Sequence, residues 1–186
     1  MKDTLRYLNF HVTAFIVAMA LVSPAYAAGP TLDQLFDELA EPEQEGWQRI
    51  EDAIWLEWSK SGSPSMDLLL KQGRDALERE DYDLALGHLT ALIDHAPDFA
   101  EGYNARATTY FQMDQYGPAM MDIRRTLELN PRHFAALTGL AVILEQMGRE
   151  DEALDAYREV MRLHPHRPNV AEAVERLELA VLGKRI

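Results

Sequence analysis

Apolar and small side chains recur at helical spacing through the middle of the chain. Residues 66–80 and residues 82–95 each place such side chains three or four positions apart, which gathers them on one face of a helix. We therefore predict a helix over 66–80, a tight turn, and a second helix over 82–95. The face-forming residues are Leu69, Gly73, Ala76 and Leu77 in the first segment, and Tyr82, Ala85, Leu89 and Leu92 in the second.

The same helix pair recurs with a period of 34 residues. Pro97, Pro131 and Pro165 mark this period, and fixed positions before each proline hold an alanine, a small residue and a large apolar residue. Small residues let two helix axes come close, and each proline disfavours helix at the residue before it. The three columns are Ala85, Ala119 and Ala153; Gly73, Ala107 and Ala141; and Leu69, Tyr103 and Leu137.

This period and these columns resemble the tetratricopeptide repeat (TPR), and the resemblance runs over residues 66–167 without a gap. It implies an all-α, right-handed TPR solenoid of three helix-turn-helix repeats at 66–99, 100–133 and 134–167. One such repeat cannot bury its apolar face alone, so the repeats stack and both ends of the array need covers. Asn130 is the expected N-cap of the third repeat.

Residues 28–65 are predicted to form an acidic, Trp-rich helical hairpin. Its first helix follows Thr31, a candidate N-cap, and its second is expected to open at Pro42. We expect the tryptophan-bearing stripe of the second helix to seal the first repeat, and a ligand cage is the alternative. The hairpin is at best a degenerate repeat, because Glu51 stands where alanine belongs. The apolar stripes are Leu32, Leu35, Phe36 and Leu39, and then Trp47, Ile50, Ile54 and Trp58.

Residues 168–186 are predicted to form a C-terminal capping helix and tail. An apolar stripe of Val170, Val174, Leu177 and Val181 lies opposite a face rich in glutamate. One apolar face and one polar face are what the end of a repeat array requires.

The first 27 residues have the layout of a signal peptide. A short basic start precedes an apolar run over residues 10–22, and Ala25 and Ala27 supply the small residues of a cleavage site. The run is shorter than the roughly 20 residues that a membrane-spanning helix needs. We expect cleavage after Ala27 and a bacterial periplasmic destination. An inner-membrane anchor formed by residues 10–22 is the alternative.

The chain carries a formal net charge of −13, with nine acids and two bases in residues 31–60. Loss of the predicted leader would remove two bases and one acid and leave −14. Such a charge works against nucleic acid or an anionic membrane surface as a partner, because both would repel it. The acidic flank is either a solvated face of the capping helices or an acidic docking patch.

The sequence contains no pattern that indicates catalysis. It has no cysteine, and no Ser-His-Asp order, glycine-rich phosphate loop or paired-carboxylate motif is evident. His133, His164 and His166 fall at predicted inter-repeat turns, where we expect exposed side chains. A weak metal site there is the alternative, although no acid or cysteine completes a ligand set at the usual spacing. We therefore expect no enzyme activity, no catalytic residue, no metal and no cofactor.

Arg106 stands in a column that usually holds leucine in the family that the chain resembles. A side chain in that column should be at least half buried, where an unpaired charge would be costly. We hypothesise that Arg106 pairs with an acid of a neighbouring second helix, either Asp122 or Asp94. The alternative is that its stem packs while its charged head reaches water.

In the family that the chain resembles, the first helices of the repeats line a concave groove that binds peptides or protein segments. Some members hold a terminal carboxylate in this groove with Lys, Asn and Arg. Of the matching columns here, which carry Leu70, Arg74, Ala105, Ala135 and Gly139, only Arg74 could serve. We therefore expect an extended, partly apolar or basic segment rather than an acidic tail. The residues predicted to line the groove and bind the partner are Leu70, Arg74, Leu77, Asn104, Thr108, Phe111, Thr138 and Val142.

Together these features predict a non-enzymatic protein–protein interaction module, an adaptor or scaffold, that binds a protein or peptide segment in the periplasm. The alternative is a structural subunit of a cell-envelope assembly that uses its outer or capping surfaces and leaves the groove unused. The sequence predicts neither the identity of the partner nor the oligomeric state.

Overall fold

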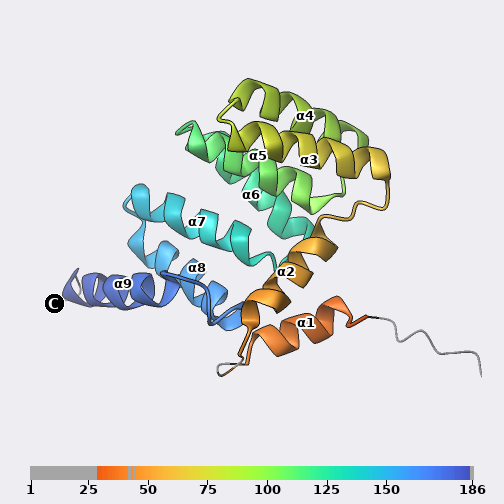
Figure 1. Cartoon of the computed structure of the whole chain (residues 1–186). Coiled ribbons are helices and arrows are strands. Elements are labelled where there is room, and N and C mark those ends of the chain that lie inside the picture. Colours follow the sequence, from red (N-terminus) through yellow and green to blue (C-terminus); the bar gives the residue numbers. More distant parts are fainter. Residues whose placement is uncertain (1–28, 42, 44, 185–186) are drawn as a thin grey trace, which may run out of the picture.

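The computed structural model describes residues 29–41, 43 and 45–184, and all of the regular structure in these residues is helical. The all-α prediction is therefore confirmed. Figure 1 shows successive helices stacked along the chain, with α1 and α2 set across the array. The helices are α1 (Leu32–Leu39), α2 (Trp47–Trp58), α3 (Pro64–Glu78), α4 (Tyr82–His95), α5 (Ala100–Gln112), α6 (Tyr116–Leu129), α7 (Phe134–Gln146), α8 (Glu150–Leu163) and α9 (Val170–Lys184).

Three helix pairs, α3–α4, α5–α6 and α7–α8, are closed by the same backbone turn. Glu80, Asp114 and Gly148 follow α3, α5 and α7, and all three have a left-handed backbone, with φ of 58°, 56° and 72°. The next residue in each turn donates its N–H to a carbonyl of the last helical turn, at 2.9 Å in all three cases. A left-handed residue that ends a helix in this way reverses the chain within a few residues. The 34-residue period of the sequence is thus repeated in the backbone.

The small-residue column lies where two helices approach closely. Gly73 on α3 faces Leu89 on α4, and a Cβ atom built on Gly73 would lie 2.6 Å from the Leu89 side chain. The equivalent Ala107 and Ala141 are buried in the same way. The three second helices end two residues before the columnar prolines, as the sequence predicts.

The third pair begins differently from the prediction. The N-cap of α7 is His133, whose Nδ1 atom accepts a hydrogen bond of 3.2 Å from the Ala136 backbone N–H. Asn130, predicted to be this cap, instead ends α6, and its side-chain oxygen accepts from the backbone N–H of Arg132. The prediction was wrong because an asparagine can serve as a turn residue as readily as an N-cap.

The N-terminal hairpin begins as predicted at α1, where Thr31 and Gln34 form a reciprocal capping box. Helix α2 starts later than expected, at Trp47, after a left-handed Gly46 with φ of 73°. Pro42, where the sequence places its start, lies outside the described residues.

The hairpin does not seal the first helix pair, so that prediction was wrong. Its apolar stripes join one core cluster with α7, α8 and α9. The reason is chemical complementarity, because Phe134, His133 and His164 offer aromatic partners to the tryptophans of α2. The linker between α2 and α3 then carries the chain to the other end of the array (Figure 1).

Helix α9 covers the exposed side of α8, as the sequence predicts. Val170, Leu177 and Val181 are buried in the shared core cluster, and Val174 packs against it. Within the described residues, none of the helices is long and apolar enough to cross a membrane.

Candidate functional site

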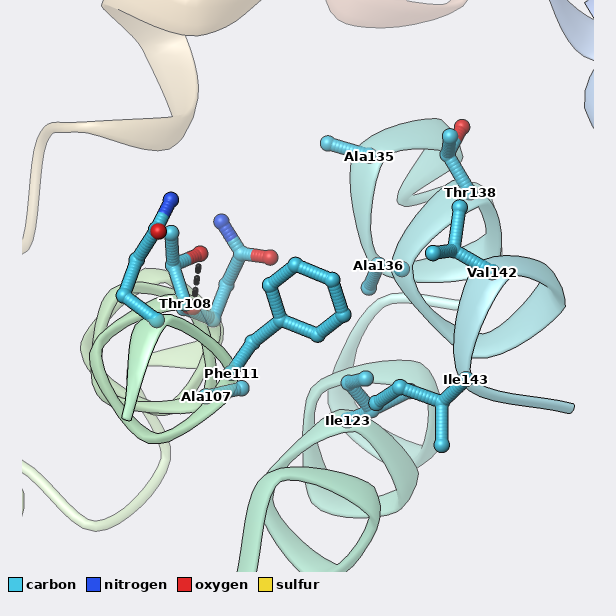
Figure 2. Close-up of a pocket in the computed structure, with 12 residues that line it drawn as sticks. Ala107, Thr108, Phe111, Ile123, Ala135, Ala136, Thr138, Val142 and Ile143 are labelled. Atoms are coloured by element: carbon cyan, nitrogen blue, oxygen red, sulfur yellow. Dashed lines mark hydrogen bonds between the residues drawn. The ribbon is translucent and has the colours of Figure 1, made fainter. Parts of the chain in front are cut away.

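A pocket of about 270 Å³ opens between α5 and α7. Figure 2 shows the ring of Phe111 extending from α5 into the space between these helices, toward Ala136 on α7 and Ile123 on α6. None of the residues lining the pocket, in the part of the chain that the structure describes, carries a charge. They are Asn104, Ala107, Thr108, Phe111, Gln112, Ile123, Ala135, Ala136, Thr138, Gly139, Val142 and Ile143.

The pocket wall is apolar with a few hydrogen-bonding groups. The Thr108 hydroxyl donates to the backbone oxygen of Asn104 at 3.0 Å, and the Thr138 hydroxyl donates to the backbone oxygen of Phe134 at 2.8 Å. Each hydroxyl proton is therefore used within its own helix, while each oxygen keeps lone pairs that can accept. Such a wall suits an apolar side chain whose backbone donates hydrogen bonds at the rim.

The structure brings five of the eight predicted groove residues together in this pocket: Asn104, Thr108, Phe111, Thr138 and Val142. The other three, Leu70, Arg74 and Leu77, lie outside its lining.

Leu70 is the clearest departure from the predicted groove. Only 2% of its surface is exposed, and it packs in a core cluster with Leu89, Leu92 and Ala105. The sequence reasoning missed the contributions of Ile123 and Ala136 to the pocket. Ala136 belongs to a run of small residues at the start of α7 that leaves room between α5 and α7, whereas nothing in the sequence singles out Ile123.

A buried carboxylate lies beside the pocket. Glu101, with 1% of its surface exposed, accepts hydrogen bonds from three side chains on three different helices or turns. Arg74 of α3 donates through Nη2, Asn104 of α5 through Nδ2 at 3.1 Å, and His133 through Nε2 at 2.8 Å. Because Nδ1 of His133 accepts from the Ala136 N–H, the proton belongs on Nε2 and the ring is neutral. We call Arg74, Glu101, Asn104 and His133 the Glu101 cluster.

Helix α2 covers the Glu101 cluster. The Trp58 indole stacks on the His133 ring with centroids 4.1 Å apart, and Trp55 meets the same ring edge-on at 5.9 Å. Arg74 lies over the Trp55 ring at 5.9 Å and also donates to the Ser59 hydroxyl at 2.9 Å. The hairpin therefore packs on the Glu101 cluster, beside the start of α7.

Comparison with known proteins identifies the family. The sequence profile described as tetratricopeptide repeat matches residues 70–120 and 104–168, which together make up more than half of the chain. The chain belongs to the tetratricopeptide repeat family. A TPR repeat-containing protein of Rhizobium etli is 37% identical over 155 residues, which are 83% of this chain and 76% of that protein. The Saccharomyces cerevisiae small glutamine-rich tetratricopeptide repeat-containing protein 2 is 30% identical over 58% of this chain, but this match spans only 31% of the yeast protein.

Solved TPR structures share the fold. The first TPR of Spaghetti (RPAP3), bound to the HSP90 peptide SRMEEVD, gives a TM-score of 0.60 at 20% identity and covers 63% of this chain and 93% of that one. The Yersinia enterocolitica type III secretion chaperone SycD, in complex with a peptide of the translocator YopD, gives 0.59 at 17% identity, with coverage of 63% and 95%.

Two of the three histidines at the turns of this TPR protein are not the exposed side chains that the sequence led us to expect, whereas His166 is partly exposed. His133 and His164 are both fully buried. Among the described residues, neither ring nitrogen of His164 has a hydrogen-bond partner. Its ring lies 5.2 Å from Trp47 and 5.0 Å from Phe134, between centroids.

Charged groups from two elements flank His164. Its Nε2 lies 3.5 Å from Oε2 of Glu51, and Arg167 binds the other carboxylate oxygen, Oε1, at 2.6 Å. Burial lowers the pKa of His164, an effect that the Glu51 carboxylate opposes and that Arg167 and His166 reinforce. Across the described residues, no group of three His, Asp or Glu side chains is arranged to hold a metal ion.

Arg106 pairs with Asp122, one of the two acids proposed from the sequence. Its Nε and Nη2 atoms donate to the two carboxylate oxygens at 2.7 and 2.9 Å, and Nη1 donates to the Thr90 hydroxyl at 3.2 Å. The hydrogen bonds to Asp122 raise the pKa of Arg106. This bidentate pair joins α5 to α6, and Thr90 extends it to α4.

Proposed function

We propose that this protein is a non-catalytic adaptor or scaffold that captures an extended segment of another protein in the groove between α5 and α7. The pocket around Phe111 carries the proposal, because it is an uncharged, largely apolar recess with hydrogen-bonding groups at its rim. Neighbours of the same fold that were solved with bound peptides support this use of the groove.

The charge of the protein favours a particular kind of segment. A net charge of −13 attracts basic partners over long range and works against nucleic acid and anionic lipid. The segment we propose therefore presents one large apolar side chain to the pocket and carries neutral or basic residues on either side.

The test is capture of a partner by groove variants. Phe111→Asp and Val142→Asp each place a carboxylate in the apolar recess and should weaken capture at least about tenfold, because a buried unpaired charge is costly. Met121→Asp is the matched control, since Met121 is 68% exposed on α6. Leu70→Asp is unsuitable because Leu70 is a core residue. Equal capture by Phe111→Asp, Val142→Asp and the wild type would contradict the proposal.

A structural role through the outer surface is the second candidate. Leu179 and Leu182 on α9 are 68% and 58% exposed, which favours a contact at that end of the array. Leu179→Asp with Leu182→Asp should then abolish assembly while the Phe111 variant assembles normally. The adaptor proposal expects the opposite result.

The proposal also includes export to the periplasm, which rests on the signal-peptide layout of residues 1–27. N-terminal sequencing of the protein from a periplasmic extract should begin at Ala28. An intact N-terminus in the membrane fraction would instead favour the anchor formed by residues 10–22.

A further inference from the structure

The donors around Glu101 form a complete binding site for one carboxylate. Arg74, Asn104 and His133 come from α3, α5 and the start of α7, and their polar hydrogens converge on the two oxygens of a single side chain. A buried carboxylate is stable only with such charge-assisted and neutral hydrogen bonds.

This carboxylate site is continuous with the groove. Asn104 lines the pocket and donates to Glu101, while Ala136 lines the pocket and donates its backbone N–H to His133. The part of a bound segment that reached this end of the groove would therefore meet the Glu101 cluster.

Arg74 is the only cation among the eight predicted groove residues. Its charge is balanced by Glu101, and the His133 ring is neutral in this arrangement. A carboxylate on the bound segment would thus find donors already in use and a like charge beside them, which disfavours binding.

We propose that the Glu101 carboxylate occupies the place between Arg74, Asn104 and His133 where a carboxylate of a bound segment would otherwise bind. Glu101 would in this way exclude segments with an acidic end. The proposal rests on the proposed function, since it names the chemistry that the groove rejects. The excluded class includes peptides such as SRMEEVD, with which the RPAP3 domain was solved.

The first test asks whether the donors accept a free carboxylate once Glu101 is removed. Glu101→Ala deletes a CH2–COO⁻ group, which acetate (CH3–COO⁻) matches in charge and closely in size. Arg74 is partly exposed and borders the vacated space. In chloride the variant should melt several degrees below the wild type. In acetate at equal ionic strength it should recover part of that loss in a saturable way.

The control is Glu145→Ala, which removes an acid of α7 that pairs with the exposed Arg176. This variant should melt alike in acetate and chloride. Absence of acetate-specific recovery in Glu101→Ala would overturn the proposal. If Glu101→Ala does not fold in either salt, Glu101→Gln, which keeps the side-chain shape, carries the second test.

The second test measures selectivity by fluorescence anisotropy with two labelled peptides, SRMEEVD and its uncharged-end counterpart SRMQQVN-amide. The wild type should prefer the uncharged-end peptide, and Glu101→Gln should shift the ratio of dissociation constants toward SRMEEVD by about tenfold, as expected for one released Arg–carboxylate pair. An unchanged ratio would overturn the role of Glu101. Binding of neither peptide to either protein would count against the groove as a peptide site, and the acetate result would still decide the role of Glu101.

Discussion

Trp58 of α2 stacks on His133 at the start of α7, with ring centroids 4.1 Å apart and planes inclined by 17°. The two residues belong to segments far apart in the chain, and His133 also donates to the buried Glu101. This contact therefore joins the N-terminal hairpin to the Glu101 cluster beside the groove, and together with the rings of Phe134 and His164 it explains why the hairpin docks on the third helix pair.

Trp58→Ala should lower the free energy of unfolding by about 3–5 kcal/mol, the usual cost of removing a large buried aromatic side chain. Leu56→Ala is the control on the same helix, because Leu56 is 60% exposed, and it should change the stability by less than about 0.5 kcal/mol. Urea unfolding followed by circular dichroism measures both. Equal midpoints for the two variants would show that the stacking does not anchor the hairpin.

Acidification should destabilise the protein through His164. Burial holds its folded-state pKa below the ordinary value of 6.5, so the unfolded chain takes up the proton first as the pH falls. The contribution of His164 to the free energy of unfolding is fully present above about pH 6.5. As the pH falls below that value, this contribution decreases by up to about 1.4 kcal/mol per pH unit until the folded-state pKa of His164 is reached. Thermal unfolding from about pH 7.5 to about pH 5 measures the slope.

His164→Phe should flatten this pH profile, because phenylalanine fits an aromatic site and takes up no proton. His95→Gln is the control, since His95 is exposed at the end of α4 and its loss should leave the slope unchanged. A His164→Phe profile as steep as that of the wild type would assign the acid sensitivity to other groups.

Arg106→Met should destabilise the protein because it leaves the buried Asp122 without its partner. We expect a loss of about 2–3 kcal/mol, below the 3–5 kcal/mol of a fully buried pair, because the Arg106 side chain is 18% exposed. Adding Asp122→Leu should restore part of that loss, and thermal unfolding of the single and double variants measures the coupling. If Arg106→Met melts no lower than the wild type while Arg106→Ala does, packing rather than pairing is the role of Arg106.

Gly73→Ala should lower stability by about 1–3 kcal/mol, because its new Cβ atom would be forced against the Leu89 side chain. Gly87→Ala on α4 is the matched control, since no neighbouring atom lies within 4 Å of a Cβ built there. The control should be neutral or gain up to about 1 kcal/mol from the higher helix propensity of alanine. Chemical denaturation compares the two, and similar effects at both sites would contradict a close approach at Gly73.

The sequence predicted well those features, such as helix bounds, that are determined by residues close together in the chain. Helix α4 spans Tyr82–His95 as predicted, because a helical stripe and a following proline are both local signals. The docking site of the hairpin could not be predicted in this way. The same stripe of Trp47, Ile50, Ile54 and Trp58 would suit any apolar surface, and only the assembled α7–α8 pair presents the matching rings.

The predicted groove shows the same limit at single positions. Leu70, Asn104 and Thr138 occupy one column of the repeat, so the sequence assigned them one role. Leu70 is buried because α3 packs on α4 and α5, whereas Asn104 and Thr138 border the open pocket between α5 and α7. Residues at the same repeat position have different surroundings here, because α3 packs directly on α5 whereas a pocket separates α5 from α7.

Docking of the hairpin also bears on how the molecule comes apart. In a simple stacked array each unit touches only its neighbours, so unfolding can start at an end and proceed unit by unit. Here α1 and α2 are held by the α7–α8 pair, and both the α3–α4 and α5–α6 pairs lie between them in the chain. Unfolding that starts at the N-terminal side would first have to break the contact between the hairpin and the α7–α8 pair. The N-terminal and C-terminal helices should therefore unfold together in one cooperative transition.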